Sequence, residues 1–185
     1  MRLYLRWPTT PADCAYWTQQ ADTDGADGVA GVIDSYGVRV PPIPGESAHA
    51  RFRRTADRLW SYDIFPPALM RPTLCSEEGR VNKGVVIVQR VRVGPAVIES
   101  AVRVIDAWAS EGDDVEEAGF TYATLAGHPE TGVSTFSVAR HGDDVEFAIK
   151  ARSRPGTLPT RIGRPLSRAF QRAATRAALR YVAAG

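Results

Sequence analysis

Alternating apolar and polar side chains are the main pattern in the second half of this chain, and they predict an antiparallel sheet. A period of two places successive side chains on opposite faces of an extended strand. In the last such segment Val145, Phe147 and Ile149 alternate with Glu146 and Lys150, so one face is expected to contact solvent. We predict about five strands, at residues 85–93, 97–110, 117–124, 133–140 and 145–153.

Two segments have helical periodicity instead. Residues 46–61 place Phe52 and Leu59 on one face, which predicts an amphipathic helix. Residues 161–184 carry an apolar stripe that includes Phe170, with arginines four residues apart on the opposite side. The C-terminal segment is therefore expected to be one long helix.

The N-terminal part has weaker patterns. Residues 1–7 alternate and predict a short strand. A helix is expected from Thr10, as its N-cap, to about Gln20. Residues 38–45 contain three prolines and exclude a central strand, and residues 69–80 are expected to be irregular.

These elements predict an α+β protein. A curved antiparallel sheet, partly closed and barrel-like, would grip the long C-terminal helix, which covers its apolar face. Small side chains on that helix favour an internal apolar cavity between helix and sheet. The small residues in question are Ala173, Ala174, Ala177 and Ala178.

Composition narrows the class of protein. The 185 residues are enough for one domain with its own core, and the net charge is +2. No apolar run reaches the length of about 18 residues that a transmembrane helix requires. The N-terminus lacks the apolar stretch of a signal peptide, so we expect a cytoplasmic protein, either a monomer or a homodimer.

Cysteines and cofactor motifs point the same way. Cys14 and Cys75 are far apart in sequence and have no metal-ligand spacing, so we predict two reduced thiols. Phosphate-binding loops, zinc clusters, Ser-His-Asp motifs and dinucleotide fingerprints are absent from the sequence. We therefore expect neither a metal nor a cofactor.

The C-terminal arginines raise the possibility of a nucleic-acid partner. Residues 151–185 contain eight arginines and no acidic residue. However, no aromatic side chains interleave with the arginines, as they do on single-strand binding platforms. A solvated helix face is the better interpretation, and no nucleic-acid partner is expected.

One motif resembles a known family. Residues 119–132 read Gly-Phe-Thr-Tyr-Ala-Thr-Leu-Ala-Gly-His-Pro-Glu-Thr-Gly. They resemble the signature Gly-Phe-Ala-Tyr-Gly-Thr-Leu-Pro-Gly-His-Pro-Glu-x-Gly-Glu-Glu of small bacterial and plant proteins catalogued as a domain of unknown function. The resemblance extends over roughly residues 45–182. It implies a single domain, residues 1–185, in which residues 45–185 form the family-like core and residues 1–44 an N-terminal extension.

The same order of elements is similar to the helix-grip fold of START and birch-allergen-like proteins. That resemblance implies an apolar ligand and, in some relatives, cyclase or dehydratase activity in polyketide biosynthesis. The chain departs from the family signature at Ala123, which replaces Gly, and at Val133 and Ser134, which replace two Glu residues. These departures suggest that its function differs from that of the family.

Three residues are candidates for catalysis. Asp106 shares a strand face with Val104 and Trp108, and a carboxyl group buried there would be a general acid. The alternative is that a bulge turns Asp106 to solvent. Tyr122 is expected to donate a hydrogen bond to a ligand oxygen, or else to be a core tyrosine. Asp63, beside a Pro-Pro turn, is expected either to point inward or to cap the preceding helix.

Other residues are candidates for contacting a ligand. They are aromatic residues near the expected cavity, or polar residues on otherwise apolar faces. They are Trp60, Tyr62, Gln89, Trp108, Phe120, Thr124 and Phe170.

His128 and Glu130 form the chemically richest turn of the chain. They could be an acid–base pair. The turn is more often structural, with the imidazole bonded to the local backbone, and we favour that interpretation.

The function these patterns favour is acid/base catalysis without a cofactor. The protein would bind an apolar oxygenated molecule and cyclise or dehydrate it in secondary metabolism, spiroketal formation by a polyketide cyclase being one example. Two alternatives stay open. One is a non-catalytic carrier or sensor of a lipid-like molecule, and the other is a protein- or nucleic-acid-binding module that uses the arginines.

Overall fold

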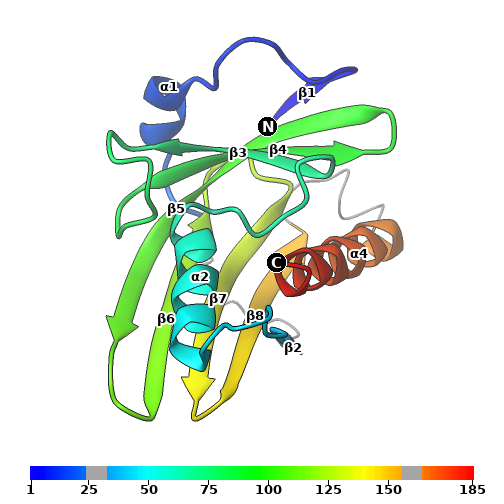
Figure 1. Ribbon diagram of the computed structural model, residues 1–185. Coiled ribbons are helices and arrows are strands. Elements are labelled where there is room, and N and C mark those ends of the chain that lie inside the picture. The colour runs from blue at the N-terminus through cyan, green and yellow to red at the C-terminus, as the bar shows by residue number, and fades with distance from the viewer. Residues whose placement is uncertain (24–32, 156–163) are drawn as a thin grey trace.

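An eight-stranded antiparallel sheet is the framework of the protein (Figure 1). The computed structural model describes residues 1–23, 33–155 and 164–185, with the side chains of residues 154–168 excepted. The strands run in the order β2-β8-β7-β6-β5-β4-β3. Strand β1 pairs with the first residues of β5, and β6 pairs with the residues of β5 that follow. Their bounds are β1 Arg2–Tyr4, β2 Ile33–Arg39, β3 Met70–Cys75, β4 Val86–Val93, β5 Ala96–Ser110, β6 Val115–Thr124, β7 Glu130–His141 and β8 Asp144–Pro155.

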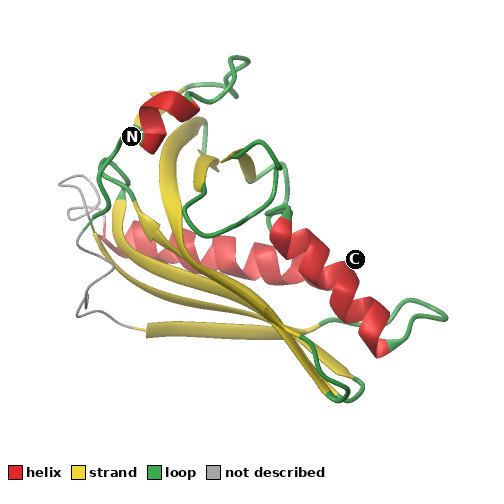
Figure 2. Ribbon diagram, turned by 90° about the vertical axis from the view of Figure 1, so that its left-hand side faces the viewer, coloured by secondary structure: helices red, strands yellow, loops and turns green. Residues whose placement is uncertain are grey.

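The two long helices lie on the same face of this sheet. They are α2 (Ala48–Trp60) and α4 (Arg164–Ala183), and a short helix, α1 (Cys14–Thr18), lies on the opposite face. Figure 2 shows that the sheet curves around the long helices. The sheet is open, with β2 and β3 as its edges. The α+β helix-grip arrangement predicted from the sequence is confirmed, without closure into a barrel.

The main core fills the space between the inner face of the sheet and the two long helices. Helix α2 contributes Phe52 and Leu59, and α4 contributes Leu179 and Val182. Aromatic rings of β6 and β7 form its centre, where Phe120 stacks on Phe136 with ring centroids 5.2 Å apart. The tight side-chain packing typical of interiors rigidifies this end of the fold.

A bulge in β5 changes which residues face the core. The pairing between β5 and β6 shifts register between Val104 and Asp106. One extra residue moves every later side chain to the opposite face. Ala107 therefore packs on the core, whereas Asp106 is exposed and Trp108 covers Gly119 on the outer face.

The N-terminal residues are bound to the outer face of the sheet. Trp17 is fully buried against β4 and β5, and its indole Nε1 donates a hydrogen bond to Glu99 at 3.2 Å. The N-cap of α1 is Asp13, which accepts a hydrogen bond from the backbone N–H of Tyr16, so the expected cap at Thr10 was wrong. Trp17, with Ala12 packed beside it, is therefore part of a second, smaller core.

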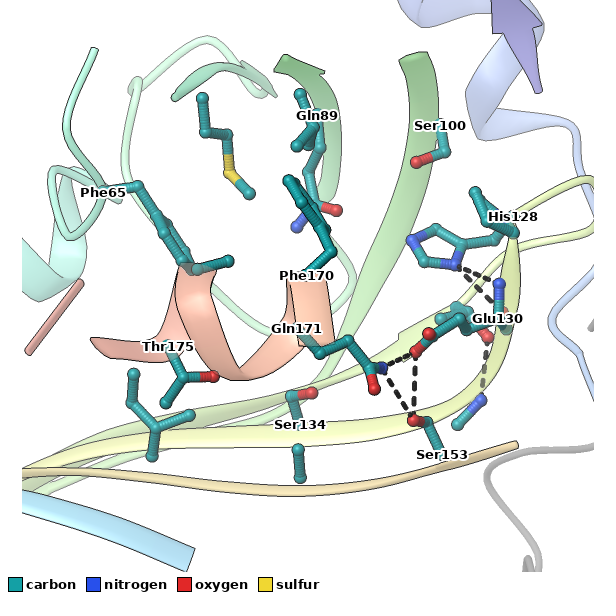
Figure 3. A pocket seen from close by; sticks show the side chains of 18 of the residues that line it. Phe65, Gln89, Ser100, His128, Glu130, Ser134, Ser153, Phe170, Gln171 and Thr175 are labelled. Atoms are coloured by element: carbon teal, nitrogen blue, oxygen red, sulfur yellow. Dashed lines mark hydrogen bonds between the residues drawn. The ribbon is translucent and has the colours of Figure 1, made fainter. Parts of the chain in front are cut away.

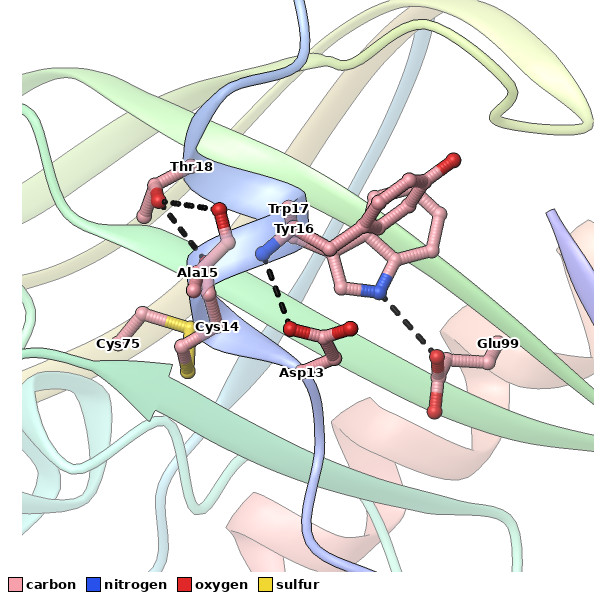
Figure 4. Close-up of a disulfide and its surroundings, with 8 residues drawn as sticks. All are labelled: Asp13, Cys14, Ala15, Tyr16, Trp17, Thr18, Cys75 and Glu99. Carbon is pink, nitrogen blue, oxygen red and sulfur yellow. Dashed lines mark hydrogen bonds between the residues drawn. A yellow bond between two sulfur atoms is a disulfide. The ribbon is translucent and has the colours of Figure 1, made fainter.

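Cys14 and Cys75 form a disulfide, which corrects the prediction of two reduced thiols (Figure 4). The fold brings α1 against the end of β3, with 5.5 Å between the two Cα atoms. The sequence did not predict this contact, because the two cysteines are 61 residues apart and come together only in the folded protein. Disulfides persist in oxidising compartments, so the cysteines no longer support the cytoplasmic prediction.

Two further strands lie outside the predicted set. Both β2 and β3 are edge strands, and residues 69–80 were expected to be irregular. Pro72 lies within β3, at an edge where the loss of a backbone donor is tolerated. Among the described residues, no helix is both long and apolar enough to cross a membrane.

Candidate functional site

A cavity of about 440 Å³ lies between the inner face of the sheet and helix α4 (Figure 3). Its wall is mostly apolar, and its apolar side chains include Phe65, Met70, Val91, Val93, Ile98, Phe136, Ile149 and Phe170. Polar and charged side chains share the wall: Asp34, Gln89, Ser100, Tyr122, Thr124, His128, Glu130, Ser134, Ser153, Gln171, Arg172 and Thr175. An apolar cavity with a few polar groups is typical of small-molecule sites.

The turn between β6 and β7 brings a histidine to this cavity. Gly127 has a φ of 82°, a left-handed conformation that glycine adopts without steric cost. The Pro129 ring then restricts the residue before it. Nδ1 of His128 lies 3.1 Å from the backbone N of Glu130 and 2.9 Å from its carbonyl oxygen. These contacts hold the imidazole so that it points into the cavity (Figure 3).

The protonation of His128 follows from its surroundings. Burial lowers the pKa of His128 to about 4, although the hydrogen bond with the Glu130 backbone acts in the opposite direction. The side chain is therefore a neutral imidazole at physiological pH. A neutral imidazole has one donor nitrogen and one acceptor nitrogen.

Glu130 connects three elements at the same end of the cavity. Its Oε2 accepts hydrogen bonds from Ser153 Oγ, at 3.0 Å, and from the side-chain amide of Gln171. The Gln171 amide also donates to Ser153 Oγ at 3.1 Å. This network joins β7, β8 and α4, so the helix is held against the sheet next to His128 (Figure 3).

A second polar group lies farther along the strands. Gln89 is almost fully buried and donates a hydrogen bond to the Tyr62 hydroxyl at 2.6 Å. Burial raises the pKa of Tyr62 well above its ordinary value and also raises that of Tyr122. Hydrogen bonding of the Tyr122 hydroxyl with Ser134 and Gln89 acts against the rise. Both hydroxyls are therefore protonated and can donate.

Tyr62 has the one positive φ among the described non-glycine residues, at 57°. A tyrosine in the left-handed region costs free energy and persists only where its surroundings fix it. The ring packs against Phe65, Phe120 and Phe136, and the hydroxyl accepts the Gln89 bond. These contacts hold Tyr62 in its strained conformation, with its hydroxyl next to Gln89 at the cavity wall.

Four of the predicted site residues line the cavity: Gln89, Tyr122, Thr124 and Phe170. Thr124 also belongs to the framework, because its hydroxyl accepts the backbone N–H of Gly132 at 3.1 Å. Two further predicted residues, Tyr62 and Phe120, lie in the core behind the wall.

The other four predicted residues lie elsewhere. The bulge in β5 turns Asp106 to solvent and Trp108 to the outer face, which corrects the expectation that they face inward. Asp63 is exposed, pairs with Arg58 at 3.3 Å and accepts a hydrogen bond from Tyr181, so it anchors the end of α4. Trp60 is half-buried and packs on the main core.

His128 and Glu130 gain importance from the structure. The imidazole does bond the local backbone, as favoured from the sequence, and it also faces the cavity. Ser100, Ser134, Ser153 and Gln171 were not singled out. Ser100 lies on the predicted face of Val102 and Val104, so the alternation was the signal that could have identified it. Ser134 had been named only as a departure from the family signature.

The described side chains contain no group of three or more His, Cys, Asp or Glu residues arranged to hold a metal ion. The cavity offers hydroxyl, amide and imidazole groups, which are hydrogen-bonding partners for an oxygenated organic molecule.

Comparison with known proteins defines the family. The chain belongs to the family described as "Domain of unknown function (DUF1990)", whose sequence model matches residues 32–181. No match is found among curated proteins.

Solved structures share the fold at low sequence identity. A hypothetical protein of Helicobacter pylori is similar with a TM-score of 0.56 and 11% identity, over 97% of this chain and 94% of that chain. Major latex-like protein 151 of Panax ginseng gives 0.44 at 14%, over 83% and 97%. Norcoclaurine synthase of Thalictrum flavum gives 0.43 at 14%, over 81% and 84%. The first of these similarities supports the fold and carries no information on ligand or activity.

Proposed function

We propose that this protein binds a largely apolar, oxygenated small molecule in the cavity between the sheet and α4. The observation that carries this proposal is the composition of the wall. A volume of about 440 Å³ is of the size that holds a drug-like molecule. Its apolar surface would provide most of the binding free energy, and its few polar groups would orient the ligand.

Two adjacent residues of α4 allow a direct test. Ala174 lines the cavity, whereas Ala173 is exposed on the same helix. The neutral dye N-phenyl-1-naphthylamine becomes fluorescent in apolar surroundings and serves as the probe. We expect the wild-type protein and Ala173→Trp to bind the dye alike, and Ala174→Trp to lose most of the binding because its indole fills the cavity. Equal binding by both variants would show that the dye binds elsewhere.

Turnover of the bound molecule in a cyclisation or dehydration is a second candidate function. The observation that favours it is that His128 and Tyr122, which can exchange protons with a ligand, line one apolar cavity. Asp106 and Asp63, which are exposed, do not contribute to this argument.

Mass spectrometry separates this function from that of a carrier. Molecules retained by wild-type protein and by His128→Gln are extracted and compared. Cyclisation would leave the mass of the retained molecule unchanged but alter its retention time, and dehydration would remove one water. Identical molecules in both proteins would support a non-catalytic carrier.

A further inference from the structure

Two sets of uncharged polar groups lie at different positions in the cavity. We call His128 and the Glu130 backbone groups bonded to it the turn site, and Gln89, Tyr122 and Ser134 the strand site. Tyr122 and Ser134 are paired across β6 and β7. Thr124 lies two residues further along β6, about 7 Å by the rise of a strand. The turn with His128 follows after that, so the two sites lie at different positions along the cavity.

The turn site presents one nitrogen to the cavity. Nδ1 of His128 is within hydrogen-bonding distance of both the N–H and the C=O of Glu130. When Nδ1 accepts the N–H, the proton is on Nε2, which then donates to a ligand. When Nδ1–H donates to the C=O, Nε2 accepts instead. Either tautomer has a partner at Nδ1, so Nε2 can bind a carbonyl or a hydroxyl oxygen.

The strand site is also uncharged. Gln89 uses one amide N–H for the Tyr62 hydroxyl. An amide has a second N–H and a carbonyl oxygen, and the Tyr122 hydroxyl can both donate and accept. A buried polar group of a ligand costs free energy unless it finds such a partner. A second ligand oxygen would be bound at this site.

Two apolar side chains belong to the wall near these sites. Ile98 of β5 and Phe170 of α4 belong to the wall, and Figure 3 shows Phe170 reaching from α4 toward the strands that carry Gln89 and Ser100. The hydroxyl of Thr124, which lies between the sites, already bonds with the Gly132 N–H at 3.1 Å and with Thr23 Oγ1 at 2.7 Å. The part of the ligand that lies against these side chains is therefore expected to be apolar.

If the cavity binds a small molecule as proposed above, we infer that its ligand has an apolar body and two hydroxyl or carbonyl oxygens, one for each of these sites. His128 Nε2 binds one oxygen, and Tyr122 with Gln89 binds the other. His128 and Tyr122 thus determine which molecules are selected, whether or not the molecule is then converted.

Aromatic diols test this inference. The probes are biphenyl, biphenyl-4-ol, biphenyl-4,4′-diol and the shorter naphthalene-2,6-diol with its parent naphthalene, and binding is measured by calorimetry. Each well-placed hydroxyl is expected to raise affinity about tenfold, the effect of one net hydrogen bond. The measured quantity is the ratio of affinities of a diol and its parent hydrocarbon. For at least one diol we expect a ratio of about one hundred.

Variants show which residues provide the gain in affinity of a diol over its parent hydrocarbon. His128→Phe and Tyr122→Phe each remove one polar group and keep a ring. Each is expected to lower the ratio about tenfold, and the double variant is expected to abolish it. His141→Phe, at an exposed position outside the cavity, is the control and should leave the ratio unchanged.

Imidazole nitrogen NMR gives a test that needs no variant. The chain has three histidines, so signals of ¹⁵N-labelled histidine can be assigned. Biphenyl-4-ol or the diol should shift the Nε2 signal of His128, and biphenyl should shift it less.

The outcomes separate this inference from the proposed function. If none of the parent hydrocarbons or diols binds to wild-type protein, the proposed function fails, and this inference fails with it. If biphenyl binds but the diols gain nothing, or keep their gain in both ring variants, the two-oxygen ligand is overturned while binding in the cavity stands.

Discussion

His128 is expected to make stability depend on pH. Burial lowers its pKa to about 4, from an ordinary value of 6.5. Between these values the unfolded chain binds a proton that the folded protein does not, so the free energy of unfolding rises with pH through this window. The stabilisation is complete above about pH 6.5 and is lost as the pH falls toward 4. Because the side chain is only half-buried, solvent screening reduces the effect, and we expect the free energy of unfolding to change by about 1–2 kcal/mol in total.

Urea unfolding at pH values from 4 to 7 measures this effect. His128→Gln should lose 1–2 kcal/mol of the rise in unfolding free energy over this window, about the contribution of the one histidine. His141→Gln, which changes an exposed histidine, should keep the wild-type slope. Equal slopes in all three proteins would mean that folding does not change the pKa of His128.

Glu99 is a second residue whose removal should be costly. It is fully buried and accepts hydrogen bonds from Arg90 Nε, at 2.8 Å, and from Trp17 Nε1. Glu99→Ala leaves the guanidinium of Arg90, itself only 9% exposed, without its charge partner. Loss of one member of a buried pair costs about 3–5 kcal/mol. Thermal and urea unfolding measure this loss.

An exposed ion pair provides the comparison. Arg53 and Glu111 lie 3.0 Å apart, with side chains 57% and 68% exposed. Glu111→Ala should cost at most about 1 kcal/mol, because solvent screens exposed charges. The Arg90→Met/Glu99→Leu double variant should recover most of the stability lost in Glu99→Ala. If Glu99→Ala and Glu111→Ala cost the same, the buried pair contributes no more than a surface pair.

Sequence alternation located part of the cavity wall correctly. Gln89, Tyr122 and Thr124 face inward as predicted, because their strands keep a regular pleat up to these positions. Asp106 was misplaced because the bulge in β5 has no signature in the residue pattern. The direction of His128 depends on the three-dimensional path of its turn and on α4, neither of which the local pattern contains.

At the level of elements, the disulfide should be an important constraint on the unfolded chain. It links residues 61 apart in sequence. Closing a loop of this length in the unfolded state stabilises the fold by about 2–4 kcal/mol. The double variant Cys14→Ser/Cys75→Ser should lose this amount in denaturant unfolding. Wild-type protein in reductant should then resemble the double variant.

The opposite result would be informative. If the double variant unfolds at the same denaturant concentration as oxidised wild-type protein, the Trp17 contacts alone hold the N-terminal residues to the sheet. The disulfide would then add no stability.

Elements with regular periodicity were predicted well, and edge strands were not. Residues of β4 to β8, α2 and α4 follow periods of 2 or 3.6 because each buries a whole face. In β2 the pattern is reversed, since Ile33 is exposed while Asp34 lines the cavity. In β3, Pro72 has no backbone N–H to donate, and a proline in a sequence normally indicates a loop and not a strand.

The molecule as a whole uses the two faces of one sheet differently. The outer face is packed by Trp17 and the disulfide at one end. The inner face is filled by aromatic and aliphatic side chains under α2 and is hollow under the first half of α4. An unfilled volume forgoes the dispersion contacts of a packed core. The cavity should therefore lower stability, and ligand binding would restore part of it.

Filling the cavity should consequently stabilise the protein and weaken binding together. Ala151 of β8 lines the cavity opposite α4, and Ala109 of β5 is exposed. Ala151→Leu buries about three more carbon atoms, so we expect the free energy of unfolding to rise by about 1–2 kcal/mol and the affinity for N-phenyl-1-naphthylamine to fall at least tenfold. Ala109→Leu should change neither quantity. A less stable Ala151→Leu protein would indicate that the wall is too rigid for a larger side chain, and unchanged dye affinity would place the ligand elsewhere.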